Sequence, residues 1–291
     1  QHPNIIQIYD FGRLEDTYFI AMEYLFGKDL KTVLQSGEER GRPLSLEEGL
    51  HITAKVCAGL DYAHHMRDLQ GQSLQIIHRD ISPPNVFITY DGQVKIIDFG
   101  IAKAASRITN TRTGVIKGKV AYMSPEQAGG RLIDHRSDIF SVGILLYEMA
   151  TRRHMYDGDA MAILAQARDA RFQRADRVVR DLPECVVMVL DQALARDPDS
   201  RYATCGDMLA DIEDCLFLLG LRPSAQKLAA TMRTLFENEI PREKALMTWE
   251  LNRSGPSPEA PPPPVTAPGE LEATVALPPP ARVRAGRRLV G

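Results

Sequence analysis

HRDISPPNV, residues 78–86, is the stretch that decides how the whole chain is interpreted. It places Asp80 directly after a His-Arg pair and five residues before Asn85. Phosphoryl transfer needs a carboxylate that orients the attacking hydroxyl, and it needs oxygen ligands for Mg²⁺, which Asp and Asn side chains supply. The stretch therefore predicts a phosphoryl-transfer loop, with Asp80 as the base-like carboxylate and Asn85 as a metal ligand.

A second acidic motif, DFG (98–100), stands thirteen residues after Asn85. Its Asp98 is expected to be the principal metal ligand, and its Gly100 a flexible hinge. The residues between form two short β-rich runs, VFITYDGQVKII (86–97), joined through Asp91–Gly92. Asp-Gly between alternating apolar residues predicts a β-hairpin, which would connect the loop to the second motif.

The flanking sequence predicts an α+β fold with a helix-dominated body. Residues 5–25 read as two strands around a polar break at 12–16, and 44–66 as a helix with Ser45 as N-cap and Glu48 as its capping-box partner. Apolar residues at helical spacing predict further helices at 137–151, 159–170, 184–195, 203–218 and 224–238.

Three more motifs follow the loop in order: YMSPE (122–126), DIFSVG (138–143) and RDPDSRYAT (196–204). With HRDISPPN and DFG, they make residues 2–218 resemble a eukaryotic-type (Hanks-type) serine/threonine protein kinase of a bacterial subfamily. The resemblance implies a protein-kinase-like fold with a complete helical large lobe and a small-lobe sheet that is mostly missing. It also implies ATP and Mg²⁺ as cofactors and proteins as substrates.

Further roles follow from the resemblance alone. Glu126 of YMSPE would pair with Arg201, and Asp138 would begin the central helix of the large lobe. His78 and Phe99 would belong to the stacked column that aligns the two lobes. The residues that match positions around the nucleotide are Met22, Glu23, Leu25, Asp29 and Phe87.

Two departures from the family pattern concern charge. Ser82 stands where the catalytic loop usually carries a Lys that contacts the γ-phosphate, and Lys119 stands where Thr is usual. Serine donates a hydrogen bond but brings no positive charge. The hypothesis is that Lys119 reaches toward Asp80 and restores the lost charge, so that Ser82 marks a subfamily variant of an active loop.

The resemblance also predicts regulation. Arg79, with a basic residue such as Lys103, would bind a phosphate on the segment between DFG and SPE. A phosphothreonine carries nearly two negative charges and orders a loop against Arg. Autophosphorylation is therefore expected at Thr111 or Thr113, with an ordinary polar loop as the alternative.

The chain begins at HPNIIQIYD, which resembles the family's segment just after its regulatory helix. No Gly-rich loop, strand Lys or partner Glu precedes it, and these groups clamp the ATP phosphates. We expect a fragment with little activity alone, whose two strands expose unpaired edges. The expected organisation is a small-lobe remnant (1–25), the large lobe (26–220), a helical extension (221–251) and a disordered proline-rich tail (252–291).

Composition narrows the partners. The net charge of −3 indicates no nucleic-acid partner, no apolar run is long enough to span a membrane, and four cysteines without CxxC spacing favour a reducing, cytoplasmic setting. His64–His65 is expected to be structural. The alternatives to a protein kinase are a non-catalytic pseudokinase or scaffold, which Ser82 and the missing lobe favour, and a small-molecule kinase, which YMSPE and DIFSVG disfavour.

Overall fold

The computed structural model describes residues 1–14, 17–99, 118 and 120–253. The chain divides into two units, Gln1–Pro241 and Arg242–Gly291, and the first contains every site discussed below. The predicted disordered tail lies outside the described residues from 254 onward. The architecture is mixed α and β with few strands, as expected.

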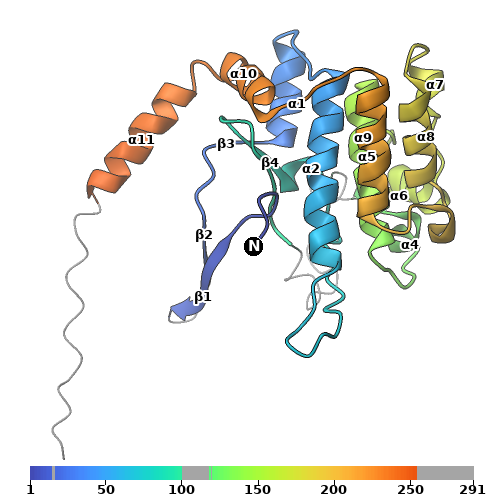
Figure 1. Cartoon of the computed structure of the whole chain (residues 1–291), viewed down its shortest axis with the longest axis horizontal. Helices are drawn as coiled ribbons and strands as arrows, with labels where there is room; N and C mark the ends of the chain where they lie inside the picture. Colours follow the sequence, from blue (N-terminus) through green and yellow to red (C-terminus); the bar gives the residue numbers. More distant parts are fainter. Residues whose placement is uncertain (15–16, 100–117, 119, 254–291) are drawn as a thin grey trace, which may run out of the picture. The chain divides into compact units, whose positions relative to one another are not determined.

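The strands of the first unit form two small sheets (Figure 1). An antiparallel pair joins β1 (Ile8–Leu14) to β2 (Thr17–Met22), and a three-stranded sheet has the order β3 (Gly27–Asp29), β4 (Val86–Thr89), β5 (Val94–Ile96). The 3₁₀ turn η1 (Pro83–Asn85) runs directly into β4. HRDISPPN therefore enters the second sheet at its central strand.

Helices make up the body of this unit. They are α1 (Leu30–Glu39), α2 (Leu46–His64), α4 (Pro125–Ala128), α5 (Arg136–Thr151), α6 (Ala160–Asp169), α7 (Ala175–Val178), α8 (Glu184–Ala193), α9 (Cys205–Leu218) and α10 (Ala225–Leu235), with the 3₁₀ turn η2 (Pro198–Ser200) before α9. The five helices predicted from residue 137 onward, and the capped helix at 44–66, are confirmed. Helices α1, α4 and α7 were not predicted from the sequence.

The core surrounds α5, which packs against α2, α8 and α9 (Figure 1). This helix has apolar residues on every side, and all its residues except Arg136 and Ala150 are buried. A helix without a polar face must be enclosed by other elements, since water would otherwise contact its apolar side chains. The rigid centre of the unit therefore holds Asp138, in the first turn of α5.

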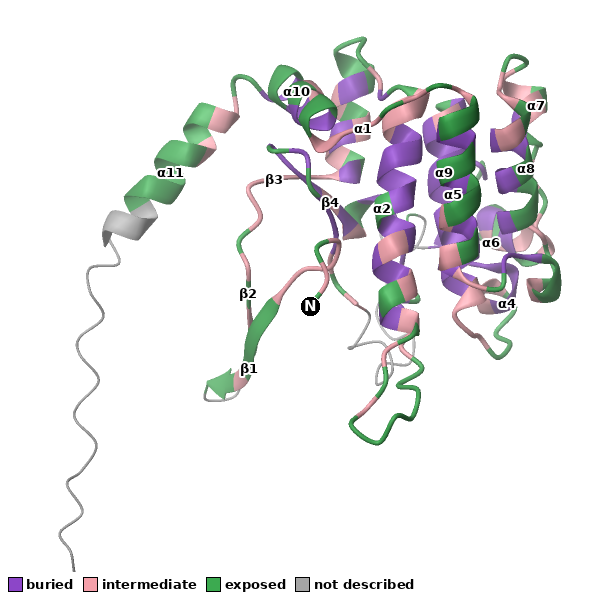
Figure 2. Cartoon of the chain, in the orientation of Figure 1, coloured by how far each residue is buried: buried purple, intermediate pink, exposed green. Residues whose placement is uncertain are grey.

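The hairpin formed by β1 and β2 is different, because within the described residues these strands pair only with each other. Most of their residues are exposed, as the green colouring of this hairpin in Figure 2 shows, and these include large apolar ones. Those more than 40 % exposed are Ile8, Tyr9, Phe11, Leu14, Tyr18, Phe19, Ile20 and Met22. An isolated two-stranded hairpin is marginally stable in water, so the expectation of unpaired strand edges is confirmed.

Local sequence explains where the site-bearing elements begin. Ser45 caps α2 by accepting from Glu48 N at 3.2 Å, and Glu48 Oε2 accepts from Ser45 N at 2.8 Å, which completes the predicted capping box. The predicted hairpin at 86–97 is also present, and its turn residue Gly92 has a φ of +84°. That conformation is free of strain for Gly alone.

Gly92 also lies against α10. A Cβ at this position would stand 1.9 Å from Ala225 O and 2.9 Å from Ala229 N. We expect Gly92→Ala to displace α10 and to lower the free energy of unfolding at least about twice as much as Gly71→Ala does. The Gly71→Ala variant carries only the cost of a left-handed backbone, about 1 kcal/mol. Gly71 is the matched control because its φ is +79° and nothing lies within 4 Å of the added Cβ. Urea unfolding measures both, and equal losses would contradict the close packing of α10.

The described part of the second unit is helical. Helix α11 (Ile240–Arg253) starts at the boundary, and Leu246 and Trp249 on it are exposed. Among the described residues, no helix combines the length and the apolar character that crossing a membrane requires.

Candidate active site

The loop at 78–80 is held by one buried carboxylate. Asp138 Oδ2 accepts from His78 N at 2.8 Å, and its Oδ1 accepts from Arg79 N at 2.8 Å. Arg79 has a φ of +66°, which costs a non-glycine residue about 1 kcal/mol. Because Asp138 is 1 % exposed, these charge-assisted bonds are shielded from water and hold the strained backbone in place.

Inside the loop, Asp80 and Asn85 are connected through the backbone. Asn85 Nδ2 donates to Asp80 O at 2.7 Å, and Ser82 Oγ donates to the same oxygen at 3.3 Å. Ser82 is 8 % exposed, so its hydroxyl supports the loop rather than facing open solvent. The amide nitrogen of Asn85 is thereby engaged, which leaves its amide oxygen for a ligand.

Asp98 comes next to this loop through β5. Ile97 N donates to Asn85 O at 2.9 Å, and Asp98 has a φ of +55°. A cavity of about 930 Å³ brings the side chains together, lined by Met22, Asp80, Lys95, Asp98 and Phe99 among others. The structure therefore assembles the two predicted catalytic carboxylates at one hollow, although 18 residues separate them in sequence.

The donor set suits a hard divalent cation. Asp98 supplies carboxylate oxygens that make no hydrogen bond or ion pair with the described residues, and Asn85 supplies its amide oxygen. Oxygen ligands of this kind are what Mg²⁺ prefers. Asp98 and Asn85 are thus the residues that would hold the metal.

His78 links the loop to the DFG segment. Its Nδ1 accepts from Asp80 N at 3.3 Å, so the other ring nitrogen, Nε2, carries the proton and donates to Ile97 O at 3.1 Å. Its ring lies 4.7 Å from that of Phe99, tilted by 59°. His78 is fully buried, so it acts as a structural connection between the two motifs.

The residues predicted to surround the nucleotide do not all line the same cavity. Met22 lines the cavity that holds Asp80 and Asp98, whereas Glu23 and Leu25 line a different hollow, of about 530 Å³. Asp29 is the N-cap of α1, and its carboxylate accepts from Thr32 N at 3.0 Å and Thr32 Oγ1 at 2.8 Å. Phe87 lies opposite Asp29 and Lys95 in the sheet and is half-buried.

Lys95 is a site residue that was not predicted from the sequence. Its ammonium is largely buried and pairs with Glu23 Oε1 at 2.7 Å, and the same oxygen accepts from Gln7 N at 2.8 Å. Strand alternation was the available signal, because Val94 and Ile96 face the core and Lys95 shares the opposite face with Phe87. The pair fixes the Glu23 side chain in the hollow of about 530 Å³, and Lys95 also lines the cavity that holds Asp80 and Asp98.

The predicted ion pair between Glu126 and Arg201 is confirmed. Two parallel bonds of 2.8 Å join the guanidinium to the carboxylate, and Ser137 Oγ donates to Glu126 Oε1 at 2.5 Å. Arg201 also donates to three backbone carbonyls and lies over the Phe140 ring. The pair connects α4, the start of α5 and the segment before α9, and so fixes the YMSPE segment beside the catalytic loop.

Acid should weaken this connection. Burial by itself would raise the pKa of Glu126, but the bonds from Arg201 and Ser137 lower it from 4.5 to about 2. A carboxyl with a lowered folded-state pKa stabilises the fold fully above pH 4.5, and this contribution, on the order of 3 kcal/mol, is lost as the pH falls toward 2. We expect Glu126→Gln to lower stability at pH 7 and to flatten the fall in unfolding free energy between pH 4.5 and 2.

Urea unfolding across that pH range measures the effect. Glu213→Gln, at an exposed carboxyl on α9, is the control and should keep the acid dependence of the unaltered chain. If Glu126→Gln kept the same dependence too, the acid sensitivity would belong to other carboxyls.

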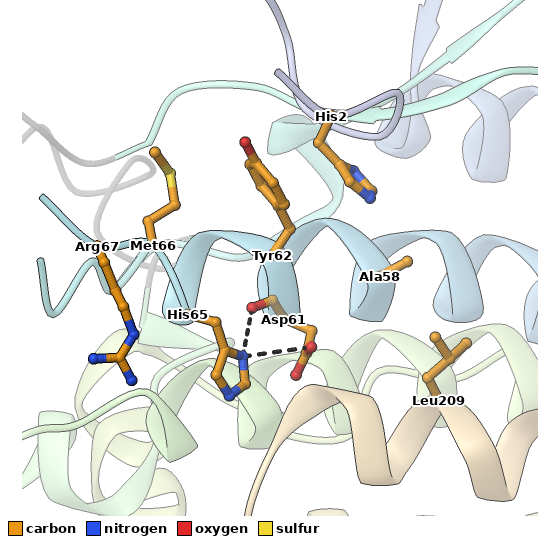
Figure 3. A pocket seen from close by; sticks show the side chains of 8 residues that line it. All are labelled: His2, Ala58, Asp61, Tyr62, His65, Met66, Arg67 and Leu209. Atoms are coloured by element: carbon orange, nitrogen blue, oxygen red, sulfur yellow. Dashed lines mark hydrogen bonds and ion pairs between the residues drawn. The ribbon is translucent and has the colours of Figure 1, made fainter. Parts of the chain in front are cut away.

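The His64–His65 pair contributes to the site in a way that the sequence did not show. His64 Nε2 bonds Asp138 Oδ2 at 2.8 Å, and so supports the carboxylate that anchors the loop. His65 instead faces Asp61 at the C-terminal end of α2, with Nδ1 2.9 Å from Asp61 O (Figure 3). No group of three or more His, Cys, Asp or Glu within the described ranges is arranged to hold a metal.

Five predicted residues cannot be placed. Gly100, Lys103, Thr111, Thr113 and Lys119 lie outside the described residues. Their roles remain predictions from the sequence.

Comparison with known proteins gives a consistent result. The family model described as "Protein kinase domain" matches residues 1–211. The chain is 43% identical over 204 residues to the tyrosine-protein kinase MasK of Myxococcus xanthus, and 40% identical over 213 residues to the serine/threonine-protein kinase PrkC of Bacillus subtilis. These matches cover 70% and 73% of this chain but 32% and 31% of the relatives, so the chain spans about a third of their length.

Among solved structures, a mutant form of the kinase domain of Mycobacterium tuberculosis PknI matches with a TM-score of 0.54 and 25% identity. The match covers 74% of this chain and 72% of that one.

Proposed function

Because the chain belongs to the protein kinase family, in its Hanks-type bacterial branch, we propose that its protein transfers the γ-phosphoryl group of ATP to serine or threonine residues of other proteins. The observation that supports this most is the cavity that holds both Asp80 and Asp98, with Asn85 bonded to the Asp80 carbonyl.

In the proposed reaction, Asp80 orients the acceptor hydroxyl and accepts its proton as the oxygen bonds to the γ-phosphorus, and the bond from that phosphorus to the departing ADP oxygen breaks. Asn85 and Asp98 would hold Mg²⁺, which would neutralise charge on the phosphates. Asp138 and His64 act behind these residues as positioning groups. Met22, Glu23, Leu25, Asp29 and Phe87 are proposed to surround the nucleotide, although Asp29 also serves as a helix cap.

Ser82 leaves the loop without its usual cation, and we propose that Lys119 supplies it. Lys119→Ala is expected to lower the rate of transfer by about 100-fold, which is the typical cost of removing one group that stabilises transition-state charge. Lys55→Ala, at an exposed position on α2, is the control. If Lys119→Ala changed neither the rate of transfer nor the stability, Lys119 would not have this role.

Regulation by autophosphorylation at Thr111 or Thr113, with Arg79 and Lys103 as the phosphate-binding pair, is also part of the proposal. Phosphosite mapping on active protein tests it, and an unmodified segment would reject it. A cytoplasmic location remains a prediction from the cysteine pattern.

The acceptor residue needs its own test, because the relatives carry both tyrosine-kinase and serine/threonine-kinase names. SPPN at 82–85 favours serine and threonine over tyrosine. The full-length protein, incubated with γ-labelled ATP, Mg²⁺ and a general protein substrate, should yield phosphoserine or phosphothreonine after acid hydrolysis. Phosphotyrosine alone would correct the acceptor, and ATP binding without transfer above that of Asp80→Asn would favour a scaffold.

A further inference from the structure

The segment 224–240 lies beyond the residues that the kinase family model matches, yet it belongs to the core of the first unit. Leu228, Met232, Leu235 and Phe236 in it are each 1 % exposed or less. A loosely attached tail would not bury four large side chains so completely. The segment is therefore a structural part of the unit, and what it contacts determines what it does.

One end of the segment is fixed to the start of α2. Lys227 Nζ lies 2.7 Å from Glu47 Oε1, and Thr231 Oγ1 donates to Glu48 Oε1 at 2.5 Å. Arg222 N also donates to Glu47 Oε1, at 3.1 Å. Because Glu48 closes the capping box of α2 with its other oxygen, this end is tied to a rigid helix terminus.

The other end reaches the residues that follow the predicted nucleotide hinge. The Phe236 ring lies 6.0 Å from that of Tyr90, and the Tyr90 ring stands edge-on to Phe26 at 4.8 Å. Tyr90 N donates to Phe26 O at 2.9 Å. The three rings form a continuous column from the C-terminal segment to Phe26, the residue directly after Glu23–Leu25.

A second contact joins the same two regions through charge. Lys28 Nζ pairs with Glu239 Oε2 at 3.1 Å and lies 5.7 Å above the Phe236 ring. Arg40 at the end of α1 bonds Glu239 Oε1 at 3.4 Å. These ion pairs are partly exposed and therefore screened by water, so the buried ring column is the main contact between the two regions.

The ring column contacts the part of the site that is proposed to surround the nucleotide. Lys28 and Asp29 pair with Ile88 and Phe87 in the sheet, and β3 leads directly into α1. The hollow of about 530 Å³ is lined by Arg233 and Ile240 from the segment and by Glu23 and Leu25 from the hinge. The contact from the segment toward the hinge therefore runs through Tyr90 and Phe26.

We propose that residues 224–240 are a brace that positions the hinge and the floor of the nucleotide site, with Phe236 as its central positioning residue. This inference rests on the proposed function, because it assigns the brace to the binding of ATP. Loosening the brace leaves the loop that carries Asp80 and Asn85 in place, since Asp138 holds its backbone at His78 and Arg79. The brace should therefore affect nucleotide affinity and not the chemical step.

The test compares Phe236→Ala with Ile212→Ala in the full-length protein. Both residues are fully buried, but Ile212 is on α9, outside the ring column. Phe236→Ala is expected to raise the dissociation constant for ATP about tenfold, with kcat at saturating ATP within about twofold of the unaltered protein. Ile212→Ala should destabilise the fold similarly and leave ATP affinity unchanged, and Phe236→Tyr, which keeps the ring, should restore most of the affinity.

Direct calorimetric titration with ATP and Mg²⁺ separates the two proposals. If the unaltered protein binds ATP but transfers no phosphate, the proposed function fails and the brace is still tested by affinity. Equal ATP affinity in Phe236→Ala and the unaltered protein would overturn the brace, as would the absence of ATP binding in the unaltered protein. Should Phe236→Ala not fold, Glu239→Ala and Lys28→Ala, at partly exposed positions, should each raise the dissociation constant by about twofold, and no change in either would also overturn it.

Discussion

Asp98→Asn is expected to reduce phosphoryl transfer by at least about 1,000-fold while the fold remains intact. The substitution removes the negative charge of the proposed principal metal ligand and keeps its shape. Metal ions supply several kcal/mol of transition-state stabilisation, and each 1.4 kcal/mol changes a rate tenfold. Because the Asp98 carboxylate makes no bond to another described residue, its loss removes no structural contact within the described part of the chain.

The backbone of Asp98 makes this substitution a clean one. Its φ of +55° lies in the left-handed region, where Asn and Asp are the side chains best tolerated after Gly. Ala at this position would add strain, whereas Asn should leave the melting temperature unchanged. Asp181→Asn, at an exposed carboxylate, is the control and should retain full activity.

Two measurements decide the outcome. The rate of transfer at saturating ATP should fall, and the extra ATP affinity that Mg²⁺ confers on the unaltered protein should disappear in the variant. A variant that keeps more than about a tenth of the rate would show that Asp98 is not the principal ligand, because loss of a metal ligand exceeds such a small effect.

The long helices could be predicted because their apolar residues recur over three or more turns. The sequence LKTVLQSGEE of α1 gave no such pattern, since Ser36 and Gly37 interrupt it. The structure gives the reason for Gly37: a Cβ there would stand 3.0 Å from Arg42 O and 3.2 Å from Pro43 Cα. A glycine that serves a close tertiary approach looks, in sequence, like a helix breaker.

The site shows the same division between local and long-range information. Motif spacing was enough to select Asp80, Asn85 and Asp98, because those residues lie within one loop–hairpin unit. The residues that position this loop could not be predicted from the sequence. His64 bonds Asp138 although 74 positions separate them, and no local pattern pairs the two. Asp29 shows the opposite case, because its sequence position suggested a contact with the nucleotide and its carboxylate caps a helix N-terminus.

Asp138 is the residue whose loss should damage stability and activity together. It accepts from His78 N, Arg79 N and the His64 ring, and it is 1 % exposed. Asp138→Ala would leave three donors without an acceptor, one of them buried and two partly buried, at about 1–3 kcal/mol for each that water cannot reach. Such a loss approaches the whole stability of an ordinary domain, so Asp138→Ala is expected to fold poorly.

Asp138→Asn is therefore the informative variant. Its amide oxygen still accepts one backbone bond, but its NH₂ group faces the other backbone N–H, so that donor loses its partner. We expect a loss of about 2–4 kcal/mol in unfolding free energy. The positive φ of Arg79 should relax once its N–H is released, which moves Asp80 away from the position fixed by the 2.7 Å bond between Asn85 Nδ2 and Asp80 O.

The consequence for catalysis is a loss larger than unfolding explains. At a temperature where Asp138→Asn is more than about 95% folded, the rate of transfer should fall about 100-fold, since small displacements of a catalytic group are this costly. Thr53→Val is the control, because Thr53 is a buried hydroxyl on α2 that donates to Gly49 O, within its own helix and away from the loop. If both variants lost activity only in proportion to the unfolded fraction, Asp138 would stabilise the helical core without positioning the catalytic loop.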